Sequence, residues 1–462
     1  MASTYLYQSP SSNGTSNQKF TWSVWLKRAS IGNIPRIFEH YNTSSYYVSL
    51  RFRDDDNARL EFYSESAGGG YKFRTDRMFR DLHAWYHIVC TIDSTESTEA
   101  DRMKLWVNGE SITDFSSTTA MSYNADLNFN NSGDTRYIGR KWENSDYFDG
   151  QMAHVNFCDG YAYQASDFGQ TDATTGIWKP KTSLSVSYGT NGYNLLFENS
   201  GNMGLDSSGN SNNFTVSGSM TQSISTPSNI FANISPLHKF GASMNITNNN
   251  LTVANSSGSN AWQMEACSHG FTKGKYYFEY KMTTLGLNNG YHKLGFISDI
   301  SSGHNSAVYP SETAVDGGYV FYNSGGNLEV RTDDNVITGY DQSTLGVSFT
   351  TNDIMCLAID KTNNRVYFRK NDDAWIKSAD PVAGTNGLDI SSDYTTDKLL
   401  IPAIAQYGSG SVGSLNFGEG FFGTTAVASA NADSNGIGAF EFSPPSGYLA
   451  LCTKNINSQE YS

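Results

Sequence analysis

Apolar and polar residues alternate over much of the chain, and this period of two constrains the fold more than any other feature of the sequence. In one example, Val48, Leu50 and Phe52 share one face of an extended chain, whereas the polar residues between them fall on the other face. This alternation is typical of a β-strand that buries one face in a core. Helical periodicity is confined to two short stretches, 76–85 and 424–432, which cannot organise a fold. The sequence therefore predicts an all-β protein.

Hairpin signals appear in both halves of the chain. The alternating segment 103–107 is followed by Asn108-Gly109, which supplies the positive φ values that a two-residue hairpin turn requires. A strand ending in Ile-Asp, a turn, a second strand and an Asn-containing turn occur twice, over 92–108 and 359–371. Two β-sandwiches of related design would produce this repetition, and so would convergent hairpin chemistry.

Composition excludes several classes of protein and partner. Aromatic residues make up 13% of the chain, which is enough to form large cores and excludes a disordered protein. The formal net charge is −14 at pH 7, so the chain lacks the positive field that attracts nucleic acid or anionic lipid. No apolar run approaches the roughly 18 residues of a membrane span, and residues 1–7 lack the basic and hydrophobic regions of a signal peptide. We expect neither nucleic-acid binding nor membrane insertion.

The cysteines indicate buried free thiols. Their number is odd, they lie far apart, and they stand in apolar, strand-like contexts at Cys90, Cys158, Cys267, Cys356 and Cys452. A disulfide framework or a zinc site would need closely spaced pairs. We therefore expect a protein made in a reducing cytoplasm.

A change in composition marks the expected domain boundary. Between residues 187 and 259 the chain is rich in Gly, Ser, Asn and Thr, and apolar residues become sparse. We place a linker at 236–259. The predicted architecture is two antiparallel β-sandwiches, over 1–235 and 260–423, joined by this Gly/Ser/Asn-rich segment, with a C-terminal extension, 424–462, that packs back on the second sandwich.

Catalytic patterns are incomplete throughout the chain. Glu61 and Glu65 have the i, i+4 spacing of a carboxylate pair on one strand face, but a glycine run follows, so the pair is expected to line a solvated hairpin end. His83 and His87 are four residues apart, but alanine stands where the zinc-protease pattern has glutamate. The glycine-rich segment 408–413 is followed by a strand-like sequence instead of the helix that a dinucleotide site requires. We expect no enzymatic activity and no cofactor.

One loop offers weak candidates for metal ligands. Asp206, Asn210 and Asn212 place oxygen atoms at alternating positions, as a calcium loop does, but the closing glutamate and the correctly placed glycine are missing. The alternative is a turn in which these side chains bind their own backbone, and residue preferences favour it.

The first half of the chain resembles laminin-G or concanavalin-A-like jelly rolls over residues 20 to about 165. The motifs that carry this resemblance are FTWSVWL at 20–26, WYHIV at 85–89, KLWVNG at 104–109, IGR at 138–140 and FDGQMAHV at 148–155. The resemblance implies a sandwich that binds ligands through its edge loops or on its concave face.

The segments that follow resemble structural proteins of tailed phages. They are DGYA at 159–162, GIWKP at 176–180, YGTNGY at 188–193, GLDSSGN at 204–210 and TPSN at 226–229. The closing segment 444–452 is similar to phage fibre-like chains. This resemblance implies a virion component assembled in the cytoplasm of a bacterial host.

Residues 260 to about 420 resemble a SPRY-type sandwich. The resemblance rests on GKYYFEY at 274–280, LGF at 294–296, DIMCLAID at 353–360, VYFRKN at 366–371, LIPA at 400–403 and LNFG at 415–418. SPRY-like domains are known chiefly for binding, so neither sandwich implies a reaction.

These resemblances imply a phage virion protein, a tail-fibre or appendage subunit that binds host surface glycan or neighbouring virion proteins through sandwich loops. A capsid decoration or head-fibre protein is the alternative, and a glycan hydrolase is a remote one. A homo-oligomer, with a trimer favoured, follows from the closed symmetry of phage appendages.

Loop aromatic residues are the candidate ligand-binding side chains, because a sugar ring stacks on an indole or phenol ring. They are Trp142, Tyr147, Tyr309, Trp375 and Tyr407. The alternative for each of them is local packing, which the burial preferences of aromatic residues favour.

Overall fold

The structure is a computed structural model with two compact units, Met1–Gln222 (unit 1) and Ser223–Ser462 (unit 2). It describes residues 4–66, 70–173, 176–240, 244–255, 262–286, 291–298, 310, 318–395 and 397–460. The prediction of an all-β protein built from antiparallel sandwiches is confirmed. The helices among the described residues are short, and none is long and apolar enough to cross a bilayer. They are α1 (Ala165–Phe168), α2 (Gln342–Leu345) and α3 (Thr453–Glu460).

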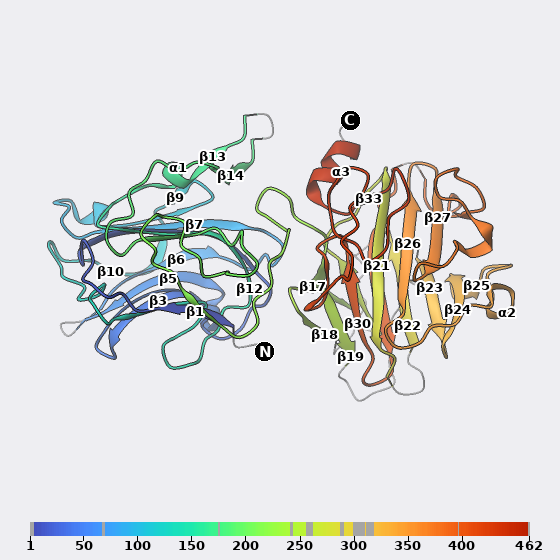
Figure 1. Ribbon diagram of the computed structural model, residues 1–462, viewed down its shortest axis with the longest axis horizontal. Helices are drawn as coiled ribbons and strands as arrows, with labels where there is room; N and C mark the ends of the chain where they lie inside the picture. Colours follow the sequence, from blue (N-terminus) through green and yellow to red (C-terminus); the bar gives the residue numbers. More distant parts are fainter. Residues whose placement is uncertain are drawn as a thin grey trace. The chain divides into compact units, whose positions relative to one another are not determined.

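Unit 1 is a sandwich of two antiparallel sheets (Figure 1). Sheet A has the order β10-β6-β5-β4-β3-β11-β1-β16, with β10 Phe115–Thr119, β6 Tyr71–Met78, β5 Arg59–Glu65, β4 Tyr46–Arg53, β3 Arg36–Thr43, β11 Thr135–Ile138, β1 Tyr5–Gln8 and β16 Thr215–Ser217. Sheet B has the order β15-β12-β2-β7-β8-β9, with β15 Tyr193–Leu195, β12 Gly150–Asp159, β2 Lys19–Arg28, β7 Tyr86–Asp93, β8 Met103–Val107 and β9 Glu110–Ile112. A separate hairpin joins β13 (Gly169–Thr171) to β14 (Trp178–Pro180).

The core of unit 1 lies between sheets A and B. On sheet A, directly paired core residues run across six strands, namely Leu6, Ile138, Phe38, Leu50, Phe62 and Phe73. Val48, Leu50 and Phe52 are buried in this core, as their alternation predicts. Because side chains alternate along a strand, the residues between these core positions point to the opposite face of sheet A.

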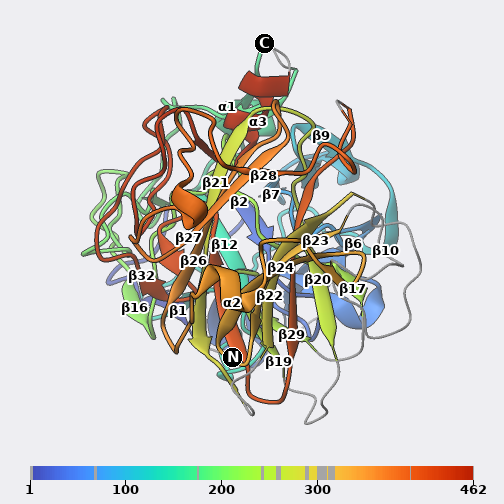
Figure 2. The ribbon, with the colours of Figure 1, turned by 90° about the vertical axis from the view of Figure 1, so that its right-hand side faces the viewer.

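Unit 2 is a second sandwich (Figure 2). Sheet C has the order β17-β20-β29-β22-β23-β24-β25, with β17 Ile234–Phe240, β20 Gln263–Cys267, β29 Ile401–Tyr407, β22 Tyr291–Ile297, β23 Tyr319–Ser324, β24 Asn327–Thr332 and β25 Asn335–Val336. Sheet D has the order β18-β19-β30-β21-β26-β27-β28, with β18 Met244–Thr247, β19 Thr252–Asn255, β30 Val412–Asn416, β21 Lys275–Thr284, β26 Ile354–Asp360, β27 Arg365–Lys370 and β28 Leu388–Asp389.

The boundary between the units differs from the sequence-based expectation. Residues 236–259 were expected to form a linker, but β17, β18 and β19 belong to the sheets of unit 2. β18 and β19 have only four residues each, and the pairing of β17 with β20 shifts register, so the segment lacks a clear alternation. These strands are fixed by a few buried apolar side chains, among them Met244 and Val253, and by pairing with strands distant in sequence.

The C-terminal segment packs on the outer face of sheet D. Phe440, Tyr448 and other apolar residues of this segment cluster with Phe422 and with side chains of β21, β26 and β27. β33 (Leu449–Ala450) runs parallel to β21 beside it. The stretch 424–432, a helical candidate from sequence, contains the short strand β32 (Thr425–Ala426) instead, and 76–85 contains no helix either.

A buried carboxylate anchors this segment. Glu279 of β21 accepts hydrogen bonds from the backbone N–H groups of Glu441 and Phe442, at 3.0 and 2.8 Å, and from the side chains of Asn416 and Tyr277. No cationic side chain is among the groups that contact this carboxylate in the described part of the chain. Burial therefore dominates and raises the pKa of Glu279 to about 7.

The five cysteines are free and buried, as predicted, and none of them pairs with another.

We predict that the contribution of Glu279 to stability falls as pH rises. Its carboxyl titrates near 4.5 when unfolded and near 7 when folded, so protonation stabilises the fold fully below the lower value and no longer does so above the higher one. Between pH 5 and pH 8 the free energy of unfolding of unit 2 should decrease by about 2 kcal/mol relative to a Glu279→Gln variant. Hydrogen exchange of β21 amides in the full chain measures this difference, and a pH-independent difference would contradict the assignment.

Candidate functional site: the outer face of sheet A

The face of sheet A that points away from the core carries aromatic and charged side chains in cross-strand rows. The strand register places directly beside one another Tyr7, Tyr137, Glu39, Ser49, Tyr63 and Lys72. A second row contains Thr135, Tyr41, Tyr47 and Glu65, and a third contains Arg36, Arg51, Glu61 and Arg74. We call this surface the outer face of sheet A.

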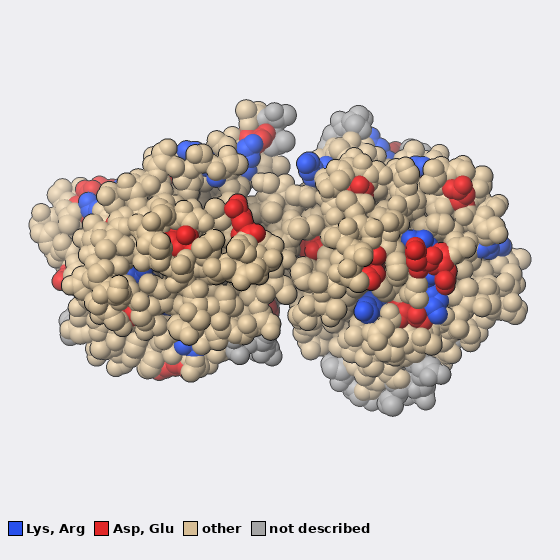
Figure 3. All heavy atoms as spheres, in the orientation of Figure 1, with Lys and Arg blue, Asp and Glu red and all other residues tan. Residues whose placement is uncertain are grey.

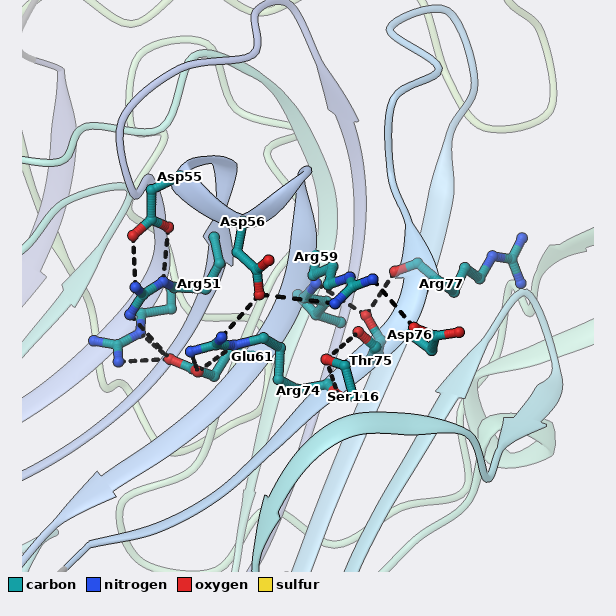
Figure 4. A network of polar contacts seen from close by, with 12 residues as sticks. Arg51, Asp55, Asp56, Arg59, Glu61, Arg74, Thr75, Asp76, Arg77 and Ser116 are labelled. Atoms are coloured by element: carbon teal, nitrogen blue, oxygen red, sulfur yellow. Dashed lines mark hydrogen bonds and ion pairs between the residues drawn. The ribbon is translucent and has the colours of Figure 1, made fainter.

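Glu61 is the centre of an arginine network on this face (Figure 4). Arg51 donates from Nε and Nη2 to Oε1 at 2.7 and 2.6 Å, and Arg74 donates from Nε and Nη2 to Oε2 at 2.8 and 2.7 Å. The residue is 0% exposed. The expectation that Glu61 lines a solvated hairpin end is therefore wrong, because the two neighbouring strands, β4 and β6, bring arginines over it. Both carboxylate oxygens are engaged, which leaves none for acid–base chemistry.

The loop 139–149 lies next to this network and places an indole on the face. Gly139 has φ +89°, a left-handed conformation that lets the chain leave β11. The backbone N–H of Trp142 then donates to Glu39 Oε1 at 2.9 Å, while Arg36 Nε donates to Oε2 at 3.0 Å. The indole stacks on the ring of Tyr41, with centroids 4.5 Å apart and an interplanar angle of 20°. Trp142 is half-buried, so the stacked pair forms a partly exposed aromatic platform.

Four tyrosines and one arginine extend the aromatic surface toward β1. The ring of Tyr5 lies 5.9 Å from that of Tyr7, 6.4 Å from that of Tyr137 and 6.2 Å from that of Tyr147. The guanidinium of Arg140 lies over Tyr5 and Tyr137, 3.9 and 4.4 Å from the two ring centroids. Tyr7 is 37% exposed, and the other three rings are half-buried.

The structure separates the predicted aromatic residues into different places. Trp142 and Tyr147 lie on the outer face of sheet A, 
whereas Tyr407 and Trp375 are in unit 2. Tyr407 is half-buried between the rings of Trp262 and Tyr291, at 5.2 and 5.5 Å. Trp375 packs beside the C-terminal segment, with the guanidinium of Arg369 4.8 Å from its ring. Tyr309 lies outside the described residues.

The candidate metal ligands form a hydrogen-bonded turn. The carboxylate of Asp206 accepts from the backbone N–H groups of Asn194, Ser208 and Asn212, at 2.8, 2.9 and 2.8 Å, and from the Ser208 hydroxyl at 2.8 Å. The side-chain amides of Asn210 and Asn212 both donate to the carbonyl of Gly192. The protein's own donors therefore surround Asp206, and this geometry is that of the turn expected as the alternative to a calcium loop.

His87 forms a serine–histidine pair that is closed to solvent. Its Nδ1 accepts a hydrogen bond from the indole N–H of Trp178 at 3.0 Å, so Nε2 carries the proton and donates to Ser23 Oγ at 2.9 Å. Trp25 stacks on the ring at 4.6 Å. Burial lowers the pKa of His87 to about 3, so it remains neutral and already donates to Ser23 instead of accepting its proton.

Sequence reasoning did not identify Tyr5, Tyr7, Tyr41, Tyr137 or Arg140 as parts of this site. The alternation in Tyr5-Leu6-Tyr7 places both tyrosines on one strand face, and this signal was available. The approach of Arg140 to Tyr5 depends on the pairing of β1 with β11, which local sequence does not specify.

Comparisons with known proteins agree with a lectin-type sandwich in unit 1. Residues 2–166 match the family model of the concanavalin A-like lectin/glucanases superfamily, Laminin_G_3. A comparison with curated proteins finds no match.

Solved structures similar to this chain include SPRY and laminin domains. The human HERC1 SPRY domain is 15% identical, with 39% of this chain and 96% of that domain covered and a TM-score of 0.29. A second human SPRY domain is 12% identical, with 37% and 93% covered and a TM-score of 0.27. Domains LG4–5 of the mouse laminin α1 chain are 9% identical, with 89% and 85% covered and a TM-score of 0.28.

We predict that Glu61 is a structural residue. Replacement by alanine leaves the surrounding guanidinium groups without their buried acceptor, and should lower the free energy of unfolding of unit 1 by about 3 kcal/mol. Glu65→Ala is the matched control on the same strand, since Glu65 is only partly buried and accepts from the Tyr63 hydroxyl; its cost should stay below about 1 kcal/mol. Urea unfolding of both variants measures these values, and equal costs would argue against the network.

Proposed function

We propose that this chain is a non-enzymatic recognition protein, a tail-fibre or appendage subunit of a tailed phage, which binds host surface glycan through the outer face of sheet A. The observation that carries this proposal is the Tyr41–Trp142 stacked platform beside a row of tyrosines and charged side chains. The resemblance of the segments between 159 and 229 to tailed-phage structural proteins supports the virion location.

The chemistry of this face suits a sugar ligand. A pyranose ring presents C–H groups that pack flat on an aromatic ring, and its hydroxyls require donors and acceptors near the ring edge. Trp142 supplies the flat surface, and Lys141 and Glu143, a partly exposed ion pair that flanks it in the loop, supply charged donors and acceptors. Figure 3 shows that the displayed surface of each unit is mostly formed by uncharged residues, which suits wet, polar contacts of this kind.

A binding role also fits the state of the carboxylates on this face. A retaining or inverting glycosidase requires one carboxylate that donates a proton and a second that attacks or activates water. Each oxygen of Glu61 accepts two hydrogen bonds from one arginine, and both oxygens of Glu39 accept hydrogen bonds from the protein. These carboxylates stabilise the shape of the face, and we propose that the chain binds and releases the glycan without cleaving it.

Binding through several copies raises the affinity of a weak binding module of this kind. A single face that holds one or two sugars binds in the millimolar to micromolar range, and several copies that engage one surface raise the affinity by about 10² to 10⁴. We therefore propose a homo-oligomer, with a trimer favoured, in which other virion subunits are the second class of partner.

We predict that Trp142→Ala weakens glycan binding by about tenfold, since the sugar loses its stacking surface. Glycan-array binding of the full chain and its variant measures the change. Tyr123→Ala is the matched control, because Tyr123 is a 58% exposed aromatic residue of unit 1 outside sheet A. If Tyr123→Ala loses glycan binding and Trp142→Ala does not, the glycan binds outside the outer face of sheet A.

Labelling of purified particles with antibody against this chain tests the virion location separately. Label on the tail supports the proposal, whereas label on the head would assign the chain to capsid decoration.

A further inference from the structure

Arg140 differs from the other buried arginines among the described residues. It is 6% exposed, and its Nε and Nη1 atoms are buried without a hydrogen-bond partner. The other six each donate to at least one protein oxygen; they are Arg28, Arg36, Arg51, Arg102, Arg136 and Arg369. Because a guanidinium stays charged at any physiological pH, Arg140 is a buried cation with unused donors.

Three carboxylates of β3 and the loop 139–149 are engaged elsewhere. Glu39 accepts from Arg36 and from the backbone of Trp142, Glu143 pairs with Lys141, and Asp146 lies 3.9 Å from Arg36. Within the part of the chain that the structure describes, no carboxylate forms an ion pair with Arg140. Its charge is balanced only by the faces of Tyr5 and Tyr137.

Arg140 requires a hydrogen-bond acceptor from outside the chain. A buried donor without an acceptor costs free energy, and a ligand that supplies the acceptor recovers it. The planar guanidinium fork matches a carboxylate, which can accept two parallel hydrogen bonds from it. The exposed ring of Tyr7, next to Tyr5, offers an apolar face to the sugar ring that bears such a group.

We propose that Arg140, with Tyr5, Tyr137 and Tyr147, forms a subsite for the carboxylate of an acidic sugar. This inference rests on the proposed glycan-binding function and names the class of glycan. Tyr147 belongs to the loop 139–149 and not to a strand, so its ring can turn away from Tyr5 without breaking sheet hydrogen bonds. Tyr147 packs against Tyr5, whose ring lies under the guanidinium, so such a movement would widen the space beside this pair on the outer face that carries Trp142.

The test uses the full chain and matched pairs of probes. Each pair consists of a carboxylate-bearing oligosaccharide, such as oligogalacturonate, an alginate oligomer or sialyllactose, and its neutral methyl ester. The wild-type chain should bind the acid of at least one pair about tenfold more tightly than the ester. Arg140→Gln should bind the two members equally, while Arg77→Gln, which removes an arginine from the edge of sheet A, should keep the preference.

Wild-type protein offers a second readout that needs no variant. The Nε–H resonance of Arg140 should shift when the preferred acid is added and should stay in place when its ester is added. Esters that bind as tightly as acids, or an acid preference that survives Arg140→Gln, would overturn the subsite while glycan binding stands. Stronger binding of a phosphorylated glycan would assign the site to phosphate instead and would likewise overturn it. If no acidic or neutral glycan binds, the proposed glycan-binding function is wrong as well.

Discussion

The strand register of sheet A determines both the core of unit 1 and the surface proposed to bind ligand. Leu6, Ile138, Phe38 and their partners form one continuous row toward the core, and the residues that alternate with them form the outer rows of tyrosine, arginine and glutamate. A slip of one residue in any pairing would exchange the two sets. Because a slip would expose the apolar row to water, the free energy that opposes the slip also fixes the positions of the outer residues.

Charged side chains also have structural roles inside this molecule. Charged residues make up only 16% of the chain, and several of them are used inside it. Arginines hold Glu61 in unit 1, backbone N–H groups hold Glu279 in unit 2, and a closed turn holds Asp206. Each carboxylate accepts its hydrogen bonds from groups of the protein itself. Arg140 stands out against this background because the protein supplies it with no matching oxygen.

Period-two alternation was sufficient to predict the all-β class and the inward position of Val48, Leu50 and Phe52. It could not predict the burial of Arg51 and Glu61, because this burial depends on the register of β4, β5 and β6, which places the arginines beside the carboxylate. The strands within 236–259 were missed for a related reason: they have few apolar residues and are stabilised by long-range pairing.

The candidate site was predictable only in part. The loop position of Trp142 and Tyr147 was visible in the sequence, and both lie on the outer face of sheet A. The loop position of Trp375 and Tyr407 carried the same signal, but these residues pack against other aromatic or basic side chains in unit 2. Local sequence identifies an aromatic residue in a loop and does not tell which sheet face the loop folds over. The position of Arg140 between Tyr5 and Tyr137 depends on two segments, β1 and residues 137–140, that meet only in the folded chain.

The most direct test of the central claim follows the indole N–H signals of the eight tryptophans by NMR while a bound glycan is added to the full chain. If glycan binds on the outer face of sheet A, the signal of Trp142 should move with ligand concentration while those of Trp178, Trp262 and Trp375 stay in place. Movement of Trp262 or Trp375 with no change at Trp142 would show that the outer face of sheet A is not where the glycan binds.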